Sequence, residues 1–361
     1  MIISRTPYRI SFFGGGTDYP GWYLKHGGAV LSTTIDKYCY LMCRYLPPFF
    51  DHRYAVRYSR IETCNSIGEI EHPSVRETLK HLGISRGMEI NHDGDLPARS
   101  GMGSSSSFTV GLLNALLALQ GRMHPTKQLA LDALHVEQDL INETVGSQDQ
   151  VAAAYGGLNH ISFLTTGDFS VRPITILPSR KQQLESHLML FYTGIMRTAS
   201  NVAASYAECL DDKRRQLRLM QALVDEAIDV LCSDGPIQRF GELLHEAWLA
   251  KRSLSPLVSS SELDQRYEAA RGAGAIGGKI TGAGGGGFML LFVPPERQPA
   301  ILDVLHELIH VPFRFESAGS QIVVADSEPD YSVAESRRQS QVPTVFRELS
   351  PVALPAAEPL N

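Results

Sequence analysis

The segment Leu96-Pro-Ala-Arg-Ser-Gly-Met-Gly-Ser-Ser-Ser-Ser107 is a run of small residues that leads directly into the apolar stretch 108–121. Small residues let a backbone approach an anion closely, and successive N–H groups in such a loop form a concave set of donors. The helix predicted for 108–121 adds the positive end of its dipole. The lysine of a G-x-x-x-x-G-K-[ST] loop is absent. The segment therefore predicts a phosphate-binding loop of another kind, with a flexible linker as the alternative.

A second glycine-rich segment lies near the other end of the chain. Five of the six residues in 282–287 are glycine, and strand-like segments, 279–281 and 288–293, flank them. Glycine weakens a fold unless a positive φ or close packing requires it. We therefore expect these glycines to pack against the phosphate loop or a ligand, with a simple turn as the alternative.

Two acids stand out between these segments. Glu137 lies in the middle of the helix predicted for 126–143, and Asp149 follows a break at Gly146 and precedes an apolar run, 151–155. A carboxylate can hold Mg²⁺ through oxygen, and another can orient or deprotonate an attacking hydroxyl. Taken singly, each is more often a surface acid, although an acid that enters an apolar segment tends to need a function or a partner.

Composition narrows the class of protein. The formal net charge of the 361 residues is -6, which gives no basic excess for binding nucleic acid. The five cysteines form no C-x-x-C pair, which is typical of reduced thiols in a cytoplasmic protein. The N-terminus has no signal-peptide pattern and no stretch is long and apolar enough to span a membrane. We therefore expect a cytoplasmic protein without a membrane or nucleic-acid partner.

The order of predicted elements indicates an α+β fold with two domains. Strands and helices are mixed rather than regularly alternating, which disfavours a doubly wound sheet. We expect an N-terminal domain over 1–170, a C-terminal domain over 171–326 and a tail over 327–361. The tail is rich in proline and lacks periodicity, so disorder is predicted for it. The predicted elements of the second half are strands 187–192 and 321–325 and helices 201–232, 236–254, 261–273 and 297–310.

In combination these segments resemble the GHMP kinases. Three motifs occur in the order of that family: Arg5–Tyr19 (RTPYRISFFGGGTDY) resembles motif 1, 96–107 resembles motif 2, and Lys279–Phe288 (KITGAGGGGF) resembles motif 3. The resemblance covers about residues 3 to 326. It implies an ATP- and Mg²⁺-dependent kinase with a ribosomal-protein-S5-like N-terminal domain and an α/β-plait-like C-terminal domain.

Within the family, the segments 14–18, 96–108 and Gly146–Gly157 (GSQDQVAAAYGG) resemble the D-glycero-D-manno-heptose 7-phosphate kinases most. The resemblance implies phosphorylation of the anomeric hydroxyl, for the synthesis of nucleotide-activated heptose. Galactokinases carry G-E-H-T-D where this chain has Gly14-Gly15-Gly16-Thr17-Asp18, so the Glu and His that hold galactose are glycines here. The alternatives are a kinase of free fucose or galactose, and a catalytically silent relative that binds a ligand.

The resemblance also implies roles for individual residues. Asp149 matches the aspartate placed against the acceptor hydroxyl, and Arg9 the arginine beside it. Ser105 and Glu137 match the two protein ligands of Mg²⁺. The acceptor sugar is expected at Gly15, Gly16, Thr17 and Asp18. The expected nucleotide-binding residues are Pro97, Arg99, Ser100, Gly101, Met102, Gly103, Ser104, Ser105, Ser106, Gly282 and Gly284.

The sequence leaves a second phosphate site unassigned. A sugar-phosphate substrate requires one, and the candidate cations are Lys37, Arg99, Arg197, Lys251 and Arg252, although each, taken singly, is more often a solvated surface charge. The sequence also leaves open the oligomeric state, a homodimer included, and whether Asp149 accepts the proton or only orients the hydroxyl.

Overall fold

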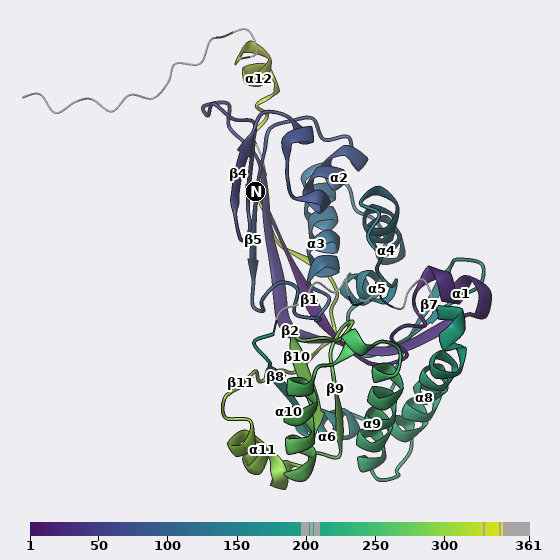
Figure 1. The fold of residues 1–361 in the computed structure, drawn as a ribbon. Helices are drawn as coiled ribbons and strands as arrows, with labels where there is room; N and C mark the ends of the chain where they lie inside the picture. Colours follow the sequence, from purple (N-terminus) through teal and green to yellow (C-terminus); the bar gives the residue numbers. More distant parts are fainter. Residues whose placement is uncertain (196–201, 203–204, 206–209, 328, 339–340, 342–361) are drawn as a thin grey trace, which may run out of the picture.

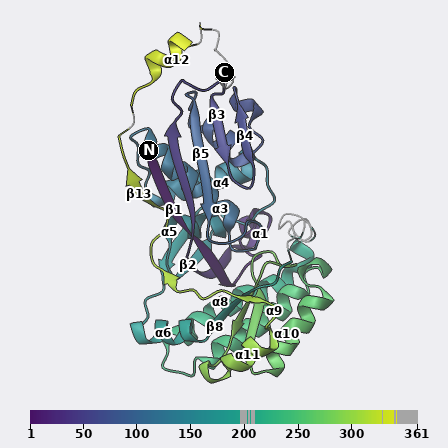
Figure 2. The same ribbon diagram turned by 90° about the vertical axis from the view of Figure 1, so that its left-hand side faces the viewer.

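The computed structural model describes residues 1–195, 202, 205, 210–327, 329–338 and 341. Two sheets and two sets of helices lie one above the other, with mixed rather than alternating order (Figures 1 and 2). This arrangement confirms the predicted α+β class. Within the described residues, no helix is both long enough and apolar enough to cross a membrane.

The upper sheet has nine strands among the described residues and follows the order β13-β1-β2-β5-β3-β4, with β12 and β6 paired to β2 and β7 paired to β6. All described pairings in it are antiparallel except that of β3 with β5. Its strands are β1 (Ile2–Phe13), β2 (Gly28–Tyr45), β3 (Tyr54–Arg57), β4 (Ile61–Cys64), β5 (Met88–Gly94), β6 (Asn159–Phe163), β7 (Phe169–Pro173), β12 (Phe315–Glu316) and β13 (Gln321–Ala325).

Helices cover one face of the upper sheet (Figure 1). The central one, α3, is buried on nearly all sides, as its uninterrupted apolar sequence predicts. The helices of this half are α1 (Pro20–His26), α2 (Pro73–His81), α3 (Ser104–Leu119), α4 (Thr126–Leu134) and α5 (Gln148–Tyr155). The helix predicted for 126–143 changes at His135 into a π-helical stretch, η2 (His135–Leu140), and ends there.

The lower sheet has the order β11-β8-β10-β9, and its helices pack beside it (Figure 1). The segment predicted as one helix over 297–310 is a short helix followed by strand β11. The elements of this half are α6 (Pro178–Ser186), β8 (Leu188–Tyr192), α8 (Arg214–Cys232), α9 (Gln238–Arg252), α10 (Ser261–Gly272), β9 (Gly277–Ile280), β10 (Phe288–Phe292), α11 (Gln298–Val304) and β11 (Ile309–His310).

Aromatic side chains join the two halves into one core. Phe12 and Phe13, at the end of β1, meet the ring of Phe240 on α9 edge to face, at centroid distances of 5.4 and 5.1 Å. Such pairs add roughly 0.5–1.5 kcal/mol beyond the apolar area that they bury. The end of β1 is therefore fixed against α9 where the two halves meet.

The last part of the chain departs from the predicted division into a C-terminal domain, 171–326, and a disordered tail, 327–361. Strands β12 and β13 return to the upper sheet, where β13 pairs with β1, so the stretch that follows β11 belongs to the N-terminal half. Residues 332–338, which lie in the predicted disordered tail, form helix α12 (Ser332–Arg338). The Glu335 carboxylate accepts a hydrogen bond from the Gly87 N–H at 3.0 Å, which fixes α12 beside β5.

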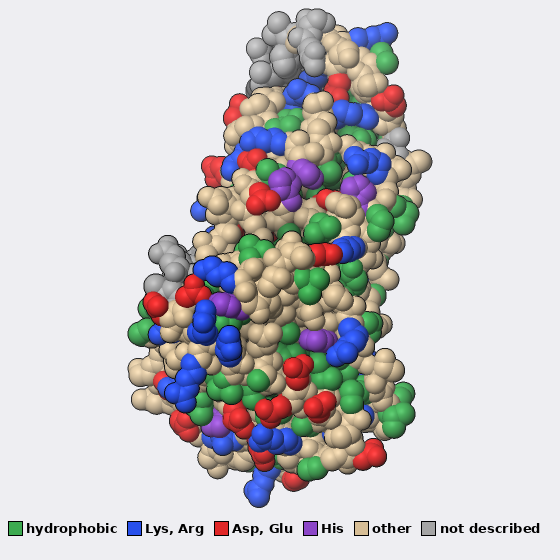
Figure 3. All heavy atoms as spheres, turned by 90° about the vertical axis from the view of Figure 1, so that its right-hand side faces the viewer, with side chains coloured by type: hydrophobic (Ala, Val, Ile, Leu, Met, Phe, Trp, Pro, Cys, Tyr) green, Lys and Arg blue, Asp and Glu red, His purple; other side chains and the backbone are tan. Residues whose placement is uncertain are grey.

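Figure 3 shows the side of the molecule that carries α1, α4 and α8. Acidic and basic side chains are interspersed over this face. Lys25 and Asp211, for example, form an exposed ion pair at 2.7 Å.

Candidate active site

The predicted motifs meet in one cleft at the junction of the two halves. The loop before α3, the turn after β1, the start of α5 and two lysines from α9 and β9 all line it. Residues of the sequence-predicted site that line the cleft are Arg9, Gly15, Gly16, Asp18, Arg99, Gly101, Gly103, Ser104, Ser105, Ser106, Glu137, Asp149 and Gly282.

Five predicted binding residues do not line the cleft. The Thr17 hydroxyl donates to the Gly14 carbonyl at 2.8 Å, and its side chain is buried, so it holds the turn rather than a ligand. Met102 is buried in the core, and its carbonyl accepts a hydrogen bond from the Arg9 N–H at 3.0 Å. The other three residues outside the lining are Pro97, Ser100 and Gly284.

The two glycine-rich segments lie directly against each other, as predicted. The helix begins at Ser104, and a Cβ placed on Gly282 would lie 2.5 Å from the Cα of Gly101. A Cβ on Gly287 would likewise lie 2.1 Å from the Ser100 carbonyl oxygen. Since no side chain fits at these contacts, the glycines let motif 3 support the phosphate loop from behind.

We expect Gly282→Ala to destabilise the protein and weaken ATP binding. Gly282 has a φ of +62, where alanine is strained by roughly 1–2 kcal/mol, and the added methyl group would also push the phosphate loop away. Gly83→Ala is a matched control, because Gly83 has a φ of +63 and open space around its Cα. Thermal melting should show a lower Tm for both variants and the larger drop for Gly282→Ala, and ATP titration should show a lower affinity for Gly282→Ala alone. Equal effects would mean that the glycine contact is unimportant.

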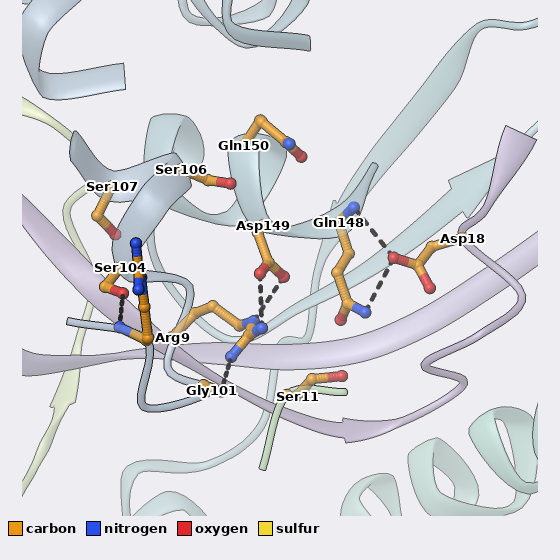
Figure 4. A network of polar contacts seen from close by, with 12 residues as sticks. Arg9, Ser11, Asp18, Gly101, Ser104, Ser106, Ser107, Gln148, Asp149 and Gln150 are labelled. Carbon is orange, nitrogen blue, oxygen red and sulfur yellow. Dashed lines mark hydrogen bonds and ion pairs between the residues drawn. The ribbon is translucent and has the colours of Figure 1, made fainter. Parts of the chain in front are cut away.

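Arg9 and Asp149 form a two-pronged ion pair in the cleft (Figure 4). Arg9 Nε donates to Asp149 Oδ1 at 2.7 Å and Arg9 Nη2 to Oδ2 at 2.6 Å. Arg9 Nη1 donates to the Gly101 carbonyl at 2.8 Å, which ties the pair to the phosphate loop. The Arg9 side chain is 4% exposed and that of Asp149 is 25% exposed. Arg9 therefore holds the carboxylate, and the carboxylate remains accessible from the cleft.

The first turn of α5 directs three consecutive side chains to three different partners. Gln148 donates to Asp18 at 3.0 Å, Asp149 pairs with Arg9, and Gln150 donates to Glu137 at 2.5 Å. Figure 4 shows Gln148 between Asp149 and Asp18. Sequence reasoning assigned no role to the two glutamines, because only their placement on this turn reveals what they contact.

Asp18 is a buried acid in the turn that follows β1. It accepts hydrogen bonds from the Gly16 N–H at 2.8 Å and from Gln148, and no cation pairs with it among the described residues. Burial is the main cause of its raised pKa, which the hydrogen bonds from Gly16 and Gln148 partly offset. A Cβ on Gly146 would lie 2.0 Å from Asp18 Oδ2, so the glycine at that position allows the carboxylate its place.

Glu137 lies in the π-helical stretch and is fully buried. Ser106 Oγ donates to its Oε2 at 2.9 Å, as does Gln150, whereas its Oε1 is buried without a partner. Burial raises the pKa of this carboxyl to about 7. A buried oxygen without a partner on the cleft wall fits a divalent cation, which would replace the missing hydrogen bond and favour the ionised form.

The serine that contacts Glu137 is Ser106, although the motif match points to Ser105. Ser105 is exposed at the cleft, one position earlier on α3. The described residues contain no cluster of three or more His, Cys, Asp or Glu side chains that could hold a metal by themselves. A cation here would therefore depend on Glu137, on a serine hydroxyl and on oxygens of the nucleotide and water.

The candidate cations for a second phosphate differ in whether they line the cleft or pair with an acid outside it. Lys251 and Arg99 line the cleft. Lys37 pairs with Asp36 at 3.0 Å, and Arg252 pairs with Asp264 at 2.6 Å, so both have partners outside the cleft. Arg197 lies outside the described residues. Lys279, which also lines the cleft, was not among the candidates.

Comparison with known proteins agrees with this geometry. Residues 71–157 match the GHMP kinases N terminal domain, and residues 220–310 match the GHMP kinases C terminal domain. A D-glycero-alpha-D-manno-heptose 7-phosphate kinase from Campylobacter jejuni is 30% identical over 321 residues, which cover 85% of this chain and 93% of that protein. A galactokinase from Pyrococcus furiosus is 26% identical over 84% of this chain and 92% of its own.

A solved structure with the same fold is that of a D-glycero-D-manno-heptose 1-phosphate kinase from Bacteroides thetaiotaomicron. Its TM-score is 0.73 at 22% identity, over 91% of this chain and all (100%) of that one. The fold and the cleft define an ATP-dependent kinase. The chain belongs to the GHMP kinase family and is a sugar kinase within it. Kinases of this family use ATP and typically Mg²⁺.

Proposed function

We propose that the protein phosphorylates D-glycero-D-manno-heptose 7-phosphate at its anomeric hydroxyl, which yields the 1,7-bisphosphate. The observation that carries this proposal is the Asp149 carboxylate, held by Arg9 and open to the cleft beside Gly15 and Gly16. The similarity to a heptose 7-phosphate kinase over most of both chains supports the choice of substrate.

Asp149 receives the acceptor hydroxyl in this proposal. Each of its oxygens accepts one bond from Arg9 and keeps a further lone-pair direction for the substrate. The sugar oxygen attacks the γ-phosphorus as the bond between that phosphorus and the β–γ bridging oxygen breaks, and ADP leaves. The hydroxyl proton passes to Asp149. An anomeric hydroxyl is more acidic than an ordinary alcohol, so a carboxylate suffices as its acceptor.

The phosphates of ATP lie along the loop that precedes α3. The backbone N–H groups of this loop and the N-terminus of a 16-residue helix provide partial positive charge without reorganisation during the reaction. Arg9 donates both to the Gly101 carbonyl in the loop and to Asp149. It therefore fixes the position of the ATP-binding loop relative to the carboxylate that receives the acceptor sugar. Phosphoryl transfer depends mainly on this kind of positioning and charge stabilisation.

Glu137 and the serines at the start of α3 would hold Mg²⁺. When bound, the ion supplies neutralisation of the charge on the phosphate oxygens. The protein's own contribution is to keep Glu137 in place through Ser106 and Gln150 and to leave Oε1 without a hydrogen-bond partner.

The substrate proposal predicts rapid ADP release with heptose 7-phosphate and poor turnover of galactose. Glu and His, which hold galactose in galactokinases, are replaced by Gly15 and Gly16, and the cleft is open beside them. We expect kcat/KM for galactose to be lower by about 100-fold or more, because its hydroxyls lack those partners. An ADP-release assay over phosphorylated and free sugars measures this. Equal use of galactose, or of fucose, would favour the free-sugar alternative.

A further inference from the structure

Two lysines of the lower half enter the cleft opposite the α5 turn. Lys251 comes from the last turn of α9 and Lys279 from β9, and both are 4% exposed. Both line the same cleft as Asp149 and Asp18. Arg9 disfavours the charged form of both lysines and Lys251 also that of Lys279, whereas Asp18 favours the charged form of both.

Neither lysine has an acidic partner in the described part of the chain. Lys279 Nζ donates to the carbonyls of Ser11 and Phe12 at 2.8 and 2.9 Å, and Lys251 Nζ donates to the carbonyl of Gly282. Each ammonium group has three protons, so donors remain on both. Burial, followed by the nearby cations, lowers the pKa of Lys251 to about 8 and that of Lys279 well below its usual value.

The two lysines thus bring two buried ammonium groups to the cleft that are bonded to carbonyls and to no acid. Arg9 pairs with Asp149, and Asp18 takes its hydrogen bonds from neutral groups, so neither acid is bonded directly to a lysine, although Asp18 favours the charged form of both from a distance. A buried and unpaired charge is strongly unfavourable unless an anion completes it. Groups held in this way on a cleft wall are commonly functional.

Two further polar atoms in this part of the cleft lack partners. Ser11 Oγ and Gln148 Oε1 are buried without hydrogen bonds, and both residues line the cleft next to Gly15. Ser11 is also the residue whose carbonyl holds Lys279. A hydroxyl donor and two ammonium groups suit the oxygens of a phosphate monoester, and the amide oxygen of Gln148 suits a sugar hydroxyl.

We propose that Lys251 and Lys279, with Ser11, form the subsite that binds the phosphate group already present on the sugar substrate. This inference rests on the proposed function and assigns the specificity for a sugar phosphate to particular residues. Lys279 is held by the carbonyls of β1 just before the Gly14–Asp18 turn, where the sugar is expected. The transferred phosphoryl group is served instead by Arg9, the loop donors and the N-terminus of α3.

The test is a comparison of kcat and KM for Lys251→Met and Lys279→Met with heptose 7-phosphate as acceptor. We expect KM to rise about 10- to 100-fold, the usual cost of losing a charge-assisted hydrogen bond, while kcat at saturation stays within about threefold. The ratio of kcat/KM for the phosphorylated and free heptose should fall by the same factor. Arg252→Met is the matched control, because Arg252 is the next cation on α9 and pairs outside the cleft.

The outcomes separate this proposal from the proposed function. A fall in kcat with KM unchanged would mean that the lysines act on the transferred phosphoryl group and would overturn the subsite. If wild type ignores heptose 7-phosphate but uses another sugar phosphate, such as mannose 6-phosphate, the proposed substrate fails. The subsite then stands if the same shift in KM occurs with that sugar, and falls if it does not. Thermal melting of the methionine variants is the control for folding, because the carbonyls of Ser11, Phe12 and Gly282 lose their donors. A variant that melts close to wild type assigns the shift in KM to the lost charge.

Discussion

Asp149→Asn should lower kcat by about 10²- to 10⁴-fold, the usual contribution of a general base. The amide keeps the shape of the side chain but carries no negative charge and cannot accept the hydroxyl proton. Its NH₂ group would also face a nitrogen of Arg9, since both carboxylate oxygens accept from that guanidinium. The variant therefore loses both proton acceptance and the orientation of the arginine. Steady-state ADP release at saturating sugar and ATP measures the effect.

Two controls separate this catalytic role from a structural one. The affinity for ATP should change little, because Asp149 acts in the transition state. Asp168→Asn is a matched variant at an exposed acid that pairs with Lys127 outside the cleft, and it should keep wild-type activity. If Asp149→Asn kept a near-normal kcat but melted at a much lower temperature, Asp149 would be a structural residue of the α5 turn.

Glu137→Gln should lower kcat by roughly 10²-fold or more and weaken the dependence on Mg²⁺, by analogy with the loss of one preorganised electrostatic contact. The amide can still accept the hydrogen bond from Ser106. It lacks the charge that a hard cation needs from its ligand. Activity as a function of Mg²⁺ concentration should give a right-shifted curve. An unchanged Mg²⁺ titration would contradict the assignment of Glu137 as the metal-binding carboxylate.

The pKa of Glu137 adds a second measurement on the same variant. Folding raises this pKa from 4.5 to about 7. Between these pH values the metal-free folded protein therefore binds more protons at Glu137 than the unfolded chain does. Its free energy of unfolding should therefore fall as the pH rises from about 4.5 to 7. Protons should likewise compete with Mg²⁺, so more Mg²⁺ is needed as the pH falls below about 7. Glu137→Gln should abolish the competition between protons and Mg²⁺ and make the fall in stability smaller than in wild type, with a remainder from buried Asp18, whose pKa is also raised. An unchanged fall would point to another group.

Prediction from the sequence succeeded where a local pattern has a single structural explanation. The glycine-rich segments predicted a loop that leads into a helix and a partner packed against it, and both were found, with the helix beginning at Ser104. The pairing of Arg9 with Asp149 was also found, and it followed from the family resemblance rather than from spacing, because 140 residues separate them.

Contacts between distant segments account for what sequence reasoning missed. Ser105 and Ser106 are chemically identical neighbours, and only the direction of α3 decides that Ser106 meets Glu137. Lys279 is the first residue of motif 3, but sequence reasoning gave its side chain no role, because only the fold shows that it enters the cleft. The return of β13 to β1 is likewise a long-range pairing with no local signal.

Helix α12 shows a different limit of structure prediction from the sequence. Its stretch of the chain is polar and rich in charge, so its composition favours disorder. The contacts of Glu335 with Gly87 and Arg53, at 3.0 and 3.5 Å, attach it to the upper sheet. These contacts are tertiary, so neither propensity nor periodicity could predict them.

The central claim is transfer of the γ-phosphate to the anomeric hydroxyl of a sugar that already carries a phosphate. Its most direct test is ³¹P and ¹H NMR of the product formed from heptose 7-phosphate, ATP and Mg²⁺. The account predicts a second phosphorus signal coupled to the anomeric proton, with one ADP formed per bisphosphate. A phosphate on any other hydroxyl, or formation of ADP without a phosphorylated sugar, would contradict it.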